Sequence, residues 1–345
     1  MQILQADALR GEKTMSAVVD PSGKGPSVAG IRLRGPFFLA PVAGYSDGAF
    51  RSVCFERGAA LCYTEMVSSE ALTRGHPKTR LLLERAPNET EYAVQLFGSR
   101  PDVLGRAAGM AAAWNPLILD LNCGCPVPKI VRTGAGSALM KNPVLIGEAV
   151  RAMRDASGLP VTVKIRLGWD EASINYDEVA DVAVEAGAAA LTLHARTRAQ
   201  GYSGKADWAA IAALAARLSV PVFGSGDVFK AVDAVRMLRE TGCSGAMIAR
   251  GAMGNPFVFE RANALLEGLP EPETGYAEVA AAARRHLELS IGFFGEKTAC
   301  VEFRKQFCAY TKGLKGGAPL RARAVHCSTA AEFGAVLDEL AIATD

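Results

Sequence analysis

The sequence predicts a (β/α)8 barrel, the TIM barrel, followed by a domain of helices. Between residue 37 and about residue 265, a short apolar run, a polar loop and a helix-length amphipathic stretch follow one another repeatedly. Continuous apolar runs are typical of parallel strands that are buried on both faces. Their alternation with helices over this length fits the barrel. A doubly wound sheet is the alternative, but the GxGxxG turn expected after its first strand does not occur.

Eight apolar runs define the predicted strands. They lie at residues 37–40, 61–65, 92–97, 117–121, 161–165, 191–194, 221–224 and 245–249. The predicted helices between them include residues 46–58, 142–158 and 177–187. Each of these stretches ends in Gly, which is a common C-terminal cap of a helix.

The strand-like runs stop near residue 275, and the rest of the chain predicts helices only. These cover residues 276–294, 297–313 and 329–341. The first residues are polar and rich in Gly, Pro and Ser, which indicates weak order. We therefore expect an N-terminal extension over residues 1–28, a catalytic barrel over 29–270 and a helical domain over 271–345.

Composition excludes several classes of protein. The chain has 345 residues, of which 50% are hydrophobic, and this is enough for one large domain and a smaller one. No apolar run approaches the ~18–20 residues of a membrane span. Eight cysteines without a secretion signal indicate reduced thiols, so we expect a cytoplasmic protein without disulfides or metal. We also expect a monomer.

Two Gly-rich loops follow the seventh and eighth predicted strands, and each precedes a helix. In a TIM barrel, this position commonly holds a phosphate group. The residues expected to present backbone amides and one guanidinium are Ser225, Gly226, Asp227, Ala249 and Arg250. The alternative is that these glycines only turn the chain, which is less plausible for both loops together.

Polar side chains also end other strands, where TIM barrels place their active sites. Gln95, Lys164 and His194 end the third, fifth and sixth strands. Each has a structural alternative: Gln95 could cap its strand, Lys164 could extend to water, and His194 could be a core residue. Their occurrence at several strand ends favours a shared site.

Cys123 and Cys125 follow the fourth strand, in the stretch LDLNCGCPVPKIVRTGAG. Their spacing does not match a zinc site, and a disulfide across one residue would be strained. Cys54, Cys62 and Cys243 lie in core-like contexts and are interpreted as packing. A thiol with an ordinary pKa of ~8.5 is mostly protonated at neutral pH, so the loop cysteines could pack, donate a proton or, if activated, act as nucleophiles.

Eight motifs of the chain resemble the tRNA-dihydrouridine synthases, most closely the bacterial B-type branch, over about residues 30–330. The family uses FMN, so the resemblance implies that a flipped-out uridine in tRNA is reduced at its C5–C6 double bond to 5,6-dihydrouridine. It also implies that NADPH reloads the flavin and that the C-terminal helices bind RNA. The motifs are LAPVAGYSDGAFR, YTEMVSSEAL, VQLFGS, LNCGCPVPKIVRTGAGSALM, PVTVKIRLGW, LTLHARTRAQGYSG, VPVFGSGDV and AMIARGAMGNPFVF.

The resemblance assigns roles to individual positions. Cys125, directly before Pro126, resembles the proton donor to uracil C5, while hydride passes from flavin N5 to C6. Cys123 stands where the family usually has an apolar residue, and Ser225 where Asn is usual. The implied flavin contacts are Pro41, Val42 and Ala43 under the ring, Gln95, Lys164 and His194 at its polar parts, and the two Gly-rich loops at the phosphate.

Residues 276–326 carry nine Lys and Arg against four Glu, although the whole chain has a net charge of only +2. This local charge fits RNA, with a solvated helical face as the alternative. Other possible functions are an FMN enzyme for a free pyrimidine or enone, an inactive RNA-binding module, and a synthase acting on ribosomal RNA. The RNA-binding candidates are Arg284, Arg285, Arg304, Lys305, Lys312 and Lys315.

Overall fold

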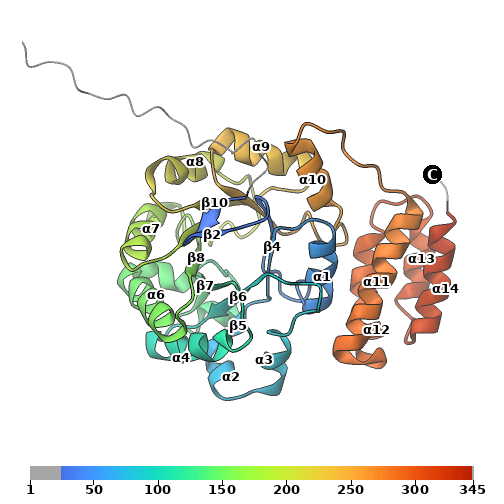
Figure 1. Cartoon of the computed structure of the whole chain (residues 1–345), viewed down its shortest axis with the longest axis horizontal. Coiled ribbons are helices and arrows are strands. Elements are labelled where there is room, and N and C mark those ends of the chain that lie inside the picture. Colours follow the sequence, from blue (N-terminus) through green and yellow to red (C-terminus); the bar gives the residue numbers. More distant parts are fainter. Residues whose placement is uncertain (1–24, 344–345) are drawn as a thin grey trace, which may run out of the picture.

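Eight parallel strands close into a barrel in the computed structural model, which describes residues 25–343 (Figure 1). Each barrel strand pairs with the next one along the chain, and the last pairs with the first. All eight coincide with predicted runs, so the expected fold class is confirmed. The strands are β3 (Phe37–Leu39), β4 (Leu61–Tyr63), β6 (Tyr92–Phe97), β7 (Ile118–Asn122), β8 (Val161–Arg166), β9 (Ala190–His194), β10 (Val222–Ser225) and β11 (Gly245–Ile248).

Helices surround the barrel, and capping residues in the sequence mark where several of them begin and end. The Asp47 side chain accepts a hydrogen bond from Phe50 N and caps the first helix, and Gly158 ends another in a left-handed conformation. The longer helices are α1 (Gly48–Glu56), α4 (Pro101–Ala112), α6 (Pro143–Ser157), α7 (Tyr176–Glu185), α8 (Trp208–Arg217), α9 (Ala231–Thr241) and α10 (Val258–Leu266).

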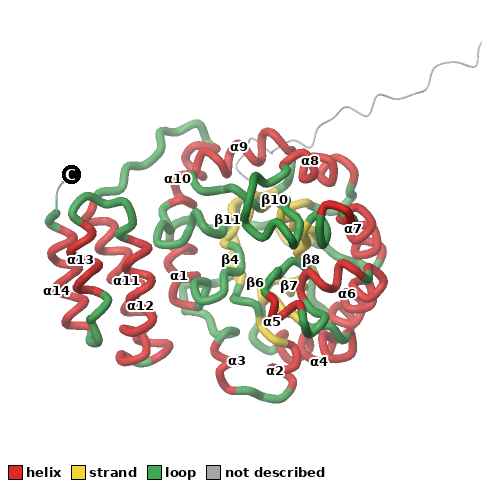
Figure 2. The backbone as a smooth tube through the Cα atoms, turned by 180° about the vertical axis from the view of Figure 1, so that it is seen from behind, coloured by secondary structure: helices red, strands yellow, loops and turns green. Residues whose placement is uncertain are grey.

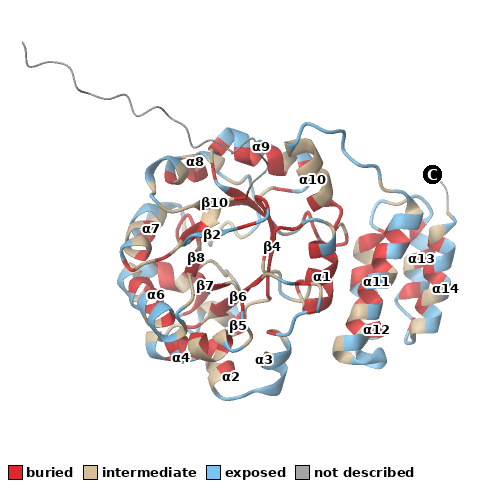
Figure 3. Ribbon diagram, viewed as in Figure 1, coloured by how far each residue is buried: buried red, intermediate tan, exposed pale blue. Residues whose placement is uncertain are grey.

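Shorter elements lie in the connections between strands and helices. The two-residue strand β5 (Val67–Ser68) pairs beside β6. The short helices are α2 (Ser69–Thr73), α3 (Pro77–Leu81) and α5 (Pro128–Val131), with 3₁₀ turns η1 (Gly136–Lys141) and η2 (Glu171–Ser173). Buried residues follow the strands and the helix faces turned toward them, whereas the outer helix faces are exposed (Figure 3).

Four helices follow the barrel and stand beside α1 (Figure 1). They are α11 (Tyr276–Phe294), α12 (Glu296–Tyr310), α13 (Gly317–Ala324) and α14 (Ala330–Ala341). The prediction missed α13, because its eight residues begin with Gly, include Pro319 and bury only small or isolated side chains. The His286 ring lies 5.3 Å from the Phe50 ring between centroids, which places α11 directly against α1.

A small hairpin precedes the barrel. Strand β1 (Ser27–Val28) pairs antiparallel with β2 (Ile31–Arg32), and the turn residues Ala29 and Gly30 both have positive φ. The prediction of weak order over residues 1–28 therefore does not hold for the last residues of that range, because the Val28 side chain is fully buried. Residues 1–24 of that extension lie outside the described residues. No helix within residues 25–343 is long and apolar enough to cross a membrane.

Candidate active site

A cavity of about 250 Å³ lies at the carboxyl ends of the barrel strands. Figure 2 shows this end of the barrel, with α5 lying across it. The structure brings together around this cavity every residue predicted for catalysis or cofactor binding. They are Pro41, Val42, Ala43, Gln95, Cys125, Lys164, His194, Ser225, Gly226, Asp227, Ala249 and Arg250.

The loop that carries Cys125 is held from three sides. Asn122 Oδ1 accepts hydrogen bonds from Cys125 N at 2.9 Å and from Gly124 N at 3.2 Å. Ser137 Oγ donates to Cys125 O at 3.0 Å, and Arg166 Nε donates to Gly124 O at 2.7 Å. These contacts fix the backbone on both sides of the thiol.

The two loop cysteines occupy different environments. Cys123 is fully buried in the core cluster, which is the packing role predicted for it. Cys125 lines the cavity. Burial raises the pKa of the Cys125 thiol, although the Val127 N–H and the cations Arg166 and Lys164 act against this shift. The thiol is therefore protonated at neutral pH and can donate a proton.

Gln95 takes part in a buried network of side chains. Its Nε2 donates to Asp120 Oδ2 at 2.7 Å, and its Oε1 accepts from Asn122 Nδ2 at 2.7 Å. Thr162 Oγ1 donates to the other oxygen of Asp120 at 2.6 Å. Burial raises the pKa of Asp120 to about 6, against the effect of these donors and of Lys164. The network therefore orients Asn122, and through it the Cys125 loop.

Lys164 and His194 face the same cavity in a strongly cationic environment. Burial, together with the charge of Arg166, lowers the pKa of Lys164 to about 8. Lys164 is half-buried and lines the cavity, as the predicted site requires. Burial and the surrounding cations hold the pKa of His194 well below its ordinary value, so the imidazole is neutral. Its Nε2 is buried and has no partner among the described residues.

The two Gly-rich loops meet at one side of the cavity. Gly226 has a φ of 116°, and a Cβ there would lie 2.8 Å from Ala206 Cβ, so this close approach requires glycine. Asp227 turns its carboxylate away toward Arg196, whose Nη2 lies 2.8 Å from both oxygens. Arg250 Nη2 lies 3.6 Å from Asp227 Oδ1. Arg250 therefore lines the cavity beside a carboxylate that is held mainly by Arg196.

The cavity suits an anionic cofactor with a planar ring. Lys164, Arg166 and Arg250 line it against the single carboxylate of Asp227, which is already paired. One buried nitrogen at this cavity, His194 Nε2, has no partner among the described residues. An unpaired buried nitrogen and surplus positive charge suit the phosphate and the polar edge of a flavin. The donor set fits FMN.

Several residues shape this site although no role in it was assigned to them from the sequence. Arg166 and Arg196 are buried and hold the surrounding loops: Arg166 through Gly124 O and Thr197 O, and Arg196 through Ser203 O. Asp120 lies inside a strand. A charged residue within the apolar run LILDL, and a second cation two residues after Lys164 and His194, were the signals available in the sequence.

The basic residues predicted to bind RNA lie outside this cavity, and four have partners within the protein. Arg284 pairs with Asp338 at 2.7 Å, and Arg285 pairs with Glu56 at 3.0 Å. Two more contacts involve α12: Arg304 Nε donates to Cys327 O, and Lys305 pairs with Glu302. Lys312 and Lys315 are exposed and form no ion pair within residues 25–343.

A barrel whose mouth combines two Gly-rich loops, a half-buried lysine and a protonated thiol fits the class of TIM-barrel cofactor enzymes. The chain belongs to the dihydrouridine synthase family, a family of flavin-dependent oxidoreductases, because the family model "Dihydrouridine synthase (Dus)" matches residues 38–344. The sequence resemblance to this family is thereby confirmed. No cluster of three or more His, Cys, Asp or Glu side chains within residues 25–343 is placed to hold a metal ion.

Similar proteins support the same assignment. The chain is 48% identical over 322 residues to a "Probable tRNA-dihydrouridine synthase" of Treponema pallidum, covering 90% of this chain and 94% of the relative. It is 37% identical over 285 residues to "tRNA-dihydrouridine synthase B" of Xanthomonas axonopodis pv. citri, covering 82% and 86%. The relatives thus include members of the B-type branch.

A solved structure of low sequence identity supports the fold. Histamine dehydrogenase from Rhizobium sp. 4-9 superposes with a TM-score of 0.57 at 14% identity, covering 78% of this chain. The chain spans about half of that structure, 51% of its length. At this identity the similarity establishes the barrel architecture alone.

Proposed function

We propose that the protein reduces the C5–C6 double bond of uridines in tRNA to 5,6-dihydrouridine, with FMN as cofactor and NADPH as reductant. The observation that carries the proposal is the Cys125 thiol. It is held on a fixed loop, its pKa is raised by burial, and it lines the same cavity as the two anion-binding loops. The family and the names of the relatives support uridine in tRNA as the substrate.

The residues that would hold FMN fall into two groups. Backbone amides of the loops at Ser225–Asp227 and Ala249–Arg250, with the Arg250 guanidinium, would bind its phosphate. Pro41, Val42 and Ala43 would lie under the ring, with Gln95, Lys164 and His194 at its polar parts. When bound, FMN supplies the hydride that uracil C6 accepts.

The chain's own contribution to the reaction is a proton and its placement. After C6 has gained hydride, uracil C5 carries enolate-like charge and needs a proton. Cys125 Sγ donates it, because the thiol is protonated at neutral pH and faces the cavity. Lys164 and Arg166 then stabilise the resulting thiolate as neighbouring cations until solvent returns the proton.

The uracil must leave its stack to reach this cavity, as enzymes that act on bases require. We propose that residues 271–345 bind the rest of the RNA, with Lys312 and Lys315 as the two of the six candidates that are exposed and form no ion pair within residues 25–343. The barrel at residues 29–270 would then carry the chemistry. The location of such an enzyme would be the cytoplasm.

The test begins with the purified protein, which should be yellow and carry one FMN per chain. NADPH should reduce the flavin, and unmodified tRNA should reoxidise it, which stopped-flow absorbance at the flavin band measures. Mass spectrometry of the digested RNA then locates dihydrouridine. A colourless protein that FMN does not reconstitute would contradict the proposal. If a free pyrimidine or ribosomal RNA reoxidised the reduced flavin as fast as tRNA does, that molecule rather than tRNA would be assigned as the substrate.

A further inference from the structure

A second cavity, of about 520 Å³, lies outside the active cavity on the same end of the barrel. It is bounded by the end of η1 and by the loop that follows β8, and its lining includes Lys141, Trp169, Asp170, Ile174 and Asn175. None of these residues belongs to the site described above. Trp169 is also absent from the core clusters of the described residues, so the indole is not required to fill the interior.

Two cations lie against the Trp169 ring. Lys141 Nζ is 3.4 Å and Arg198 Cζ is 4.5 Å from the ring centroid. Lys141 is exposed, so its flexible chain can leave the ring. Because an exposed lysine is held only weakly over a half-buried ring, a stacked nucleobase is the stronger occupant of that face. Lys141 would then be available for a phosphate.

Polar groups beside this cavity lack partners. Arg198 Nε is buried without an acceptor, and Asn175 Oδ1 is buried without a donor, among the described residues. Asn175 Nδ2 is used, since it donates to Met140 O at 2.7 Å. Unsatisfied buried polar atoms are rare in native proteins and commonly mark a place where a ligand or water completes the hydrogen bonding.

The loop that carries Trp169 is firmly held. Arg198 N donates to Gly168 O and Ala199 N donates to Trp169 O, both at 2.9 Å. A Cβ on Gly168 would lie 2.2 Å from Ser173 O, so the loop closes tightly on itself at this point. The indole is therefore presented on a fixed backbone, which lowers the entropic cost of binding a ligand.

Exposed cations run along the segment from Cys125 to this cavity. Lys129 and Arg132 lie on and directly after α5, Lys141 ends η1, and none forms an ion pair within residues 25–343. A row of unpaired cations is the electrostatic signature of a polyphosphate chain. It leads away from the reacting thiol toward Trp169, which favours an RNA strand over a dinucleotide with its few phosphates.

We propose that the Trp169 cavity binds a nucleotide of the RNA substrate that flanks the reduced uridine. The base stacks on the indole, and its phosphate contacts Lys141 and Arg198. Single-stranded RNA is commonly bound by such stacking on an aromatic side chain beside a cation. The inference rests on the proposed function, because it requires RNA to enter the active cavity.

The experiment uses the FMN-loaded protein and an unmodified tRNA transcript. Trp169→Ala should weaken tRNA binding about 10-fold, and Trp169→Phe, which retains a stacking face, should stay within about 3-fold of wild type. Lys141→Gln should lower the salt dependence of log K by about 0.7, the contribution of one phosphate on a single strand. Arg151→Gln, which removes an exposed cation from the outer helix α6, is the matched control and should change neither value.

Three outcomes would overturn the inference. Trp169→Ala could bind tRNA as wild type does, Lys141→Gln could leave the salt dependence unchanged, or Trp169→Ala could raise the KM for NADPH while tRNA affinity stays constant. The last result would assign the cavity to the dinucleotide. If the Trp169→Ala variant does not fold, the tRNA affinity of Trp169→Phe and the salt dependence of Lys141→Gln still test the inference. The proposed function fails separately, if tRNA does not reoxidise the wild-type flavin.

Discussion

Cys123 and Cys125 are separated by one residue, yet their thiols have different surroundings. The Cys123 side chain is fully buried and packs in the barrel core. The chain then turns over Gly124, whose N–H is bound by Asn122, and Cys125 faces the cavity. Proximity to Lys164 and Arg166 does not outweigh burial, so the pKa of Cys125 remains above its ordinary value. The residue is thus suited to donate a proton rather than to attack as a thiolate.

Cys125→Ala should retain FMN, NADPH oxidation and tRNA binding, and lose ~10²–10⁴-fold in the rate of uridine reduction, the usual cost of removing a general acid. The measurement is single-turnover reoxidation of the reduced flavin by unmodified tRNA. Cys123→Ala is the control and should keep the rate within a few-fold. If Cys123→Ala abolishes the reaction and Cys125→Ala does not, the proton comes from the other thiol.

Lys164 should make FMN binding dependent on pH. Its pKa of about 8 means that the ammonium is largely charged at neutral pH and loses its charge as the pH rises through that value. Since FMN is anionic, its affinity should fall across this range. Titration of the flavin-free protein with FMN between about pH 6.5 and 9.5 measures this affinity. The Lys164→Met variant should bind FMN more weakly at neutral pH, and its affinity should not change with pH.

The control for this titration is Lys78→Met, an exposed lysine on α3 outside the cavity, which should reproduce the wild-type profile. A wild-type affinity that is constant over the whole range would exclude a charged Lys164 from the cofactor site. The same conclusion would follow if Lys164→Met kept the wild-type affinity at neutral pH.

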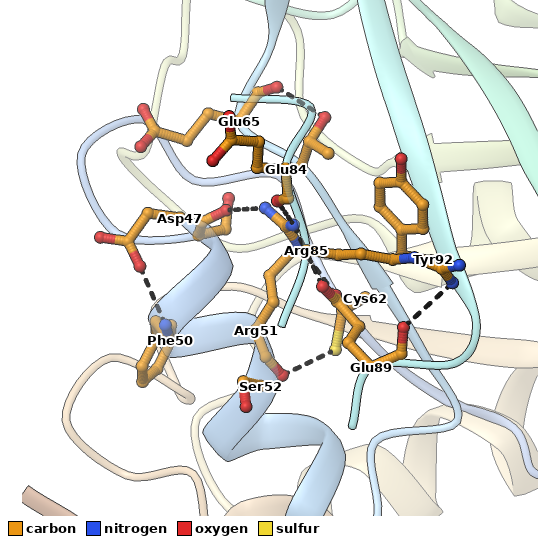
Figure 4. Close-up of polar contacts among 12 residues, drawn as sticks. Asp47, Phe50, Arg51, Ser52, Cys62, Glu65, Glu84, Arg85, Glu89 and Tyr92 are labelled. Atoms are coloured by element: carbon orange, nitrogen blue, oxygen red, sulfur yellow. Dashed lines mark hydrogen bonds and ion pairs between the residues drawn. The ribbon is translucent and has the colours of Figure 1, made fainter. Parts of the chain in front are cut away.

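At the scale of elements, a buried ion pair joins α1 to the connection before β6 (Figure 4). Arg51 Nε lies 2.8 Å from Glu89 Oε1, and both side chains are fully buried. The same guanidinium donates to Ser46 O at 3.1 Å and to Glu84 O at 2.7 Å. Ser46 in turn binds Val42 N through its hydroxyl, at 2.9 Å. The pair therefore supports the loop proposed to lie under the flavin.

Arg51→Met should lower the free energy of unfolding by ~3–5 kcal/mol, because it leaves the Glu89 carboxylate buried without a partner. Arg74→Gln is the matched control: Arg74 pairs with Glu70 at 3.0 Å on the surface, so its loss should cost less than ~1 kcal/mol. Urea denaturation followed by circular dichroism measures both. Equal, small effects would show that the buried pair contributes little to stability.

The whole molecule places a helical domain beside the barrel, with α11 against α1. Much of the positive charge on these helices is used within the protein, as in the Arg284–Asp338 and Arg285–Glu56 pairs. The second of these links α11 to the barrel helix α1. The local excess of positive charge therefore serves partly to hold the domain in place, and only the unpaired cations remain for a polyanion.

Lys312→Glu combined with Lys315→Glu should weaken tRNA binding and reduce its salt dependence, because both exposed lysines lie in the connection between α12 and α13. The control is Arg239→Glu, which reverses the charge of an exposed residue on the barrel helix α9. Fluorescence anisotropy with labelled tRNA at several salt concentrations measures the change. If the double variant and the control bind alike, this connection does not contact RNA.

The barrel and the region of its site could be predicted from the sequence. Strand and helix positions depend on the periodicity of apolar residues and on turn residues, which are properties of near neighbours along the chain. Because parallel strands share one carboxyl edge, the strand ends at Gln95, Lys164 and His194 could be assigned to one site. The hairpin at Ser27–Arg32 was missed because its strands are too short to show a period, and helix α13 because it buries too few large apolar side chains.

Only the tertiary structure decided how these side chains interact. The pairing of Gln95 with Asp120, the contact of Arg196 with Asp227 and the lowered pKa of Lys164 all join residues far apart in the chain. The same holds for the ion pairs that occupy Arg284 and Arg285. Burial and electrostatic coupling depend on distance in space, which local patterns do not contain. The sequence by itself determined which residues reach the barrel mouth, and the fold determined their charge, their partners and which of them remain free for a ligand.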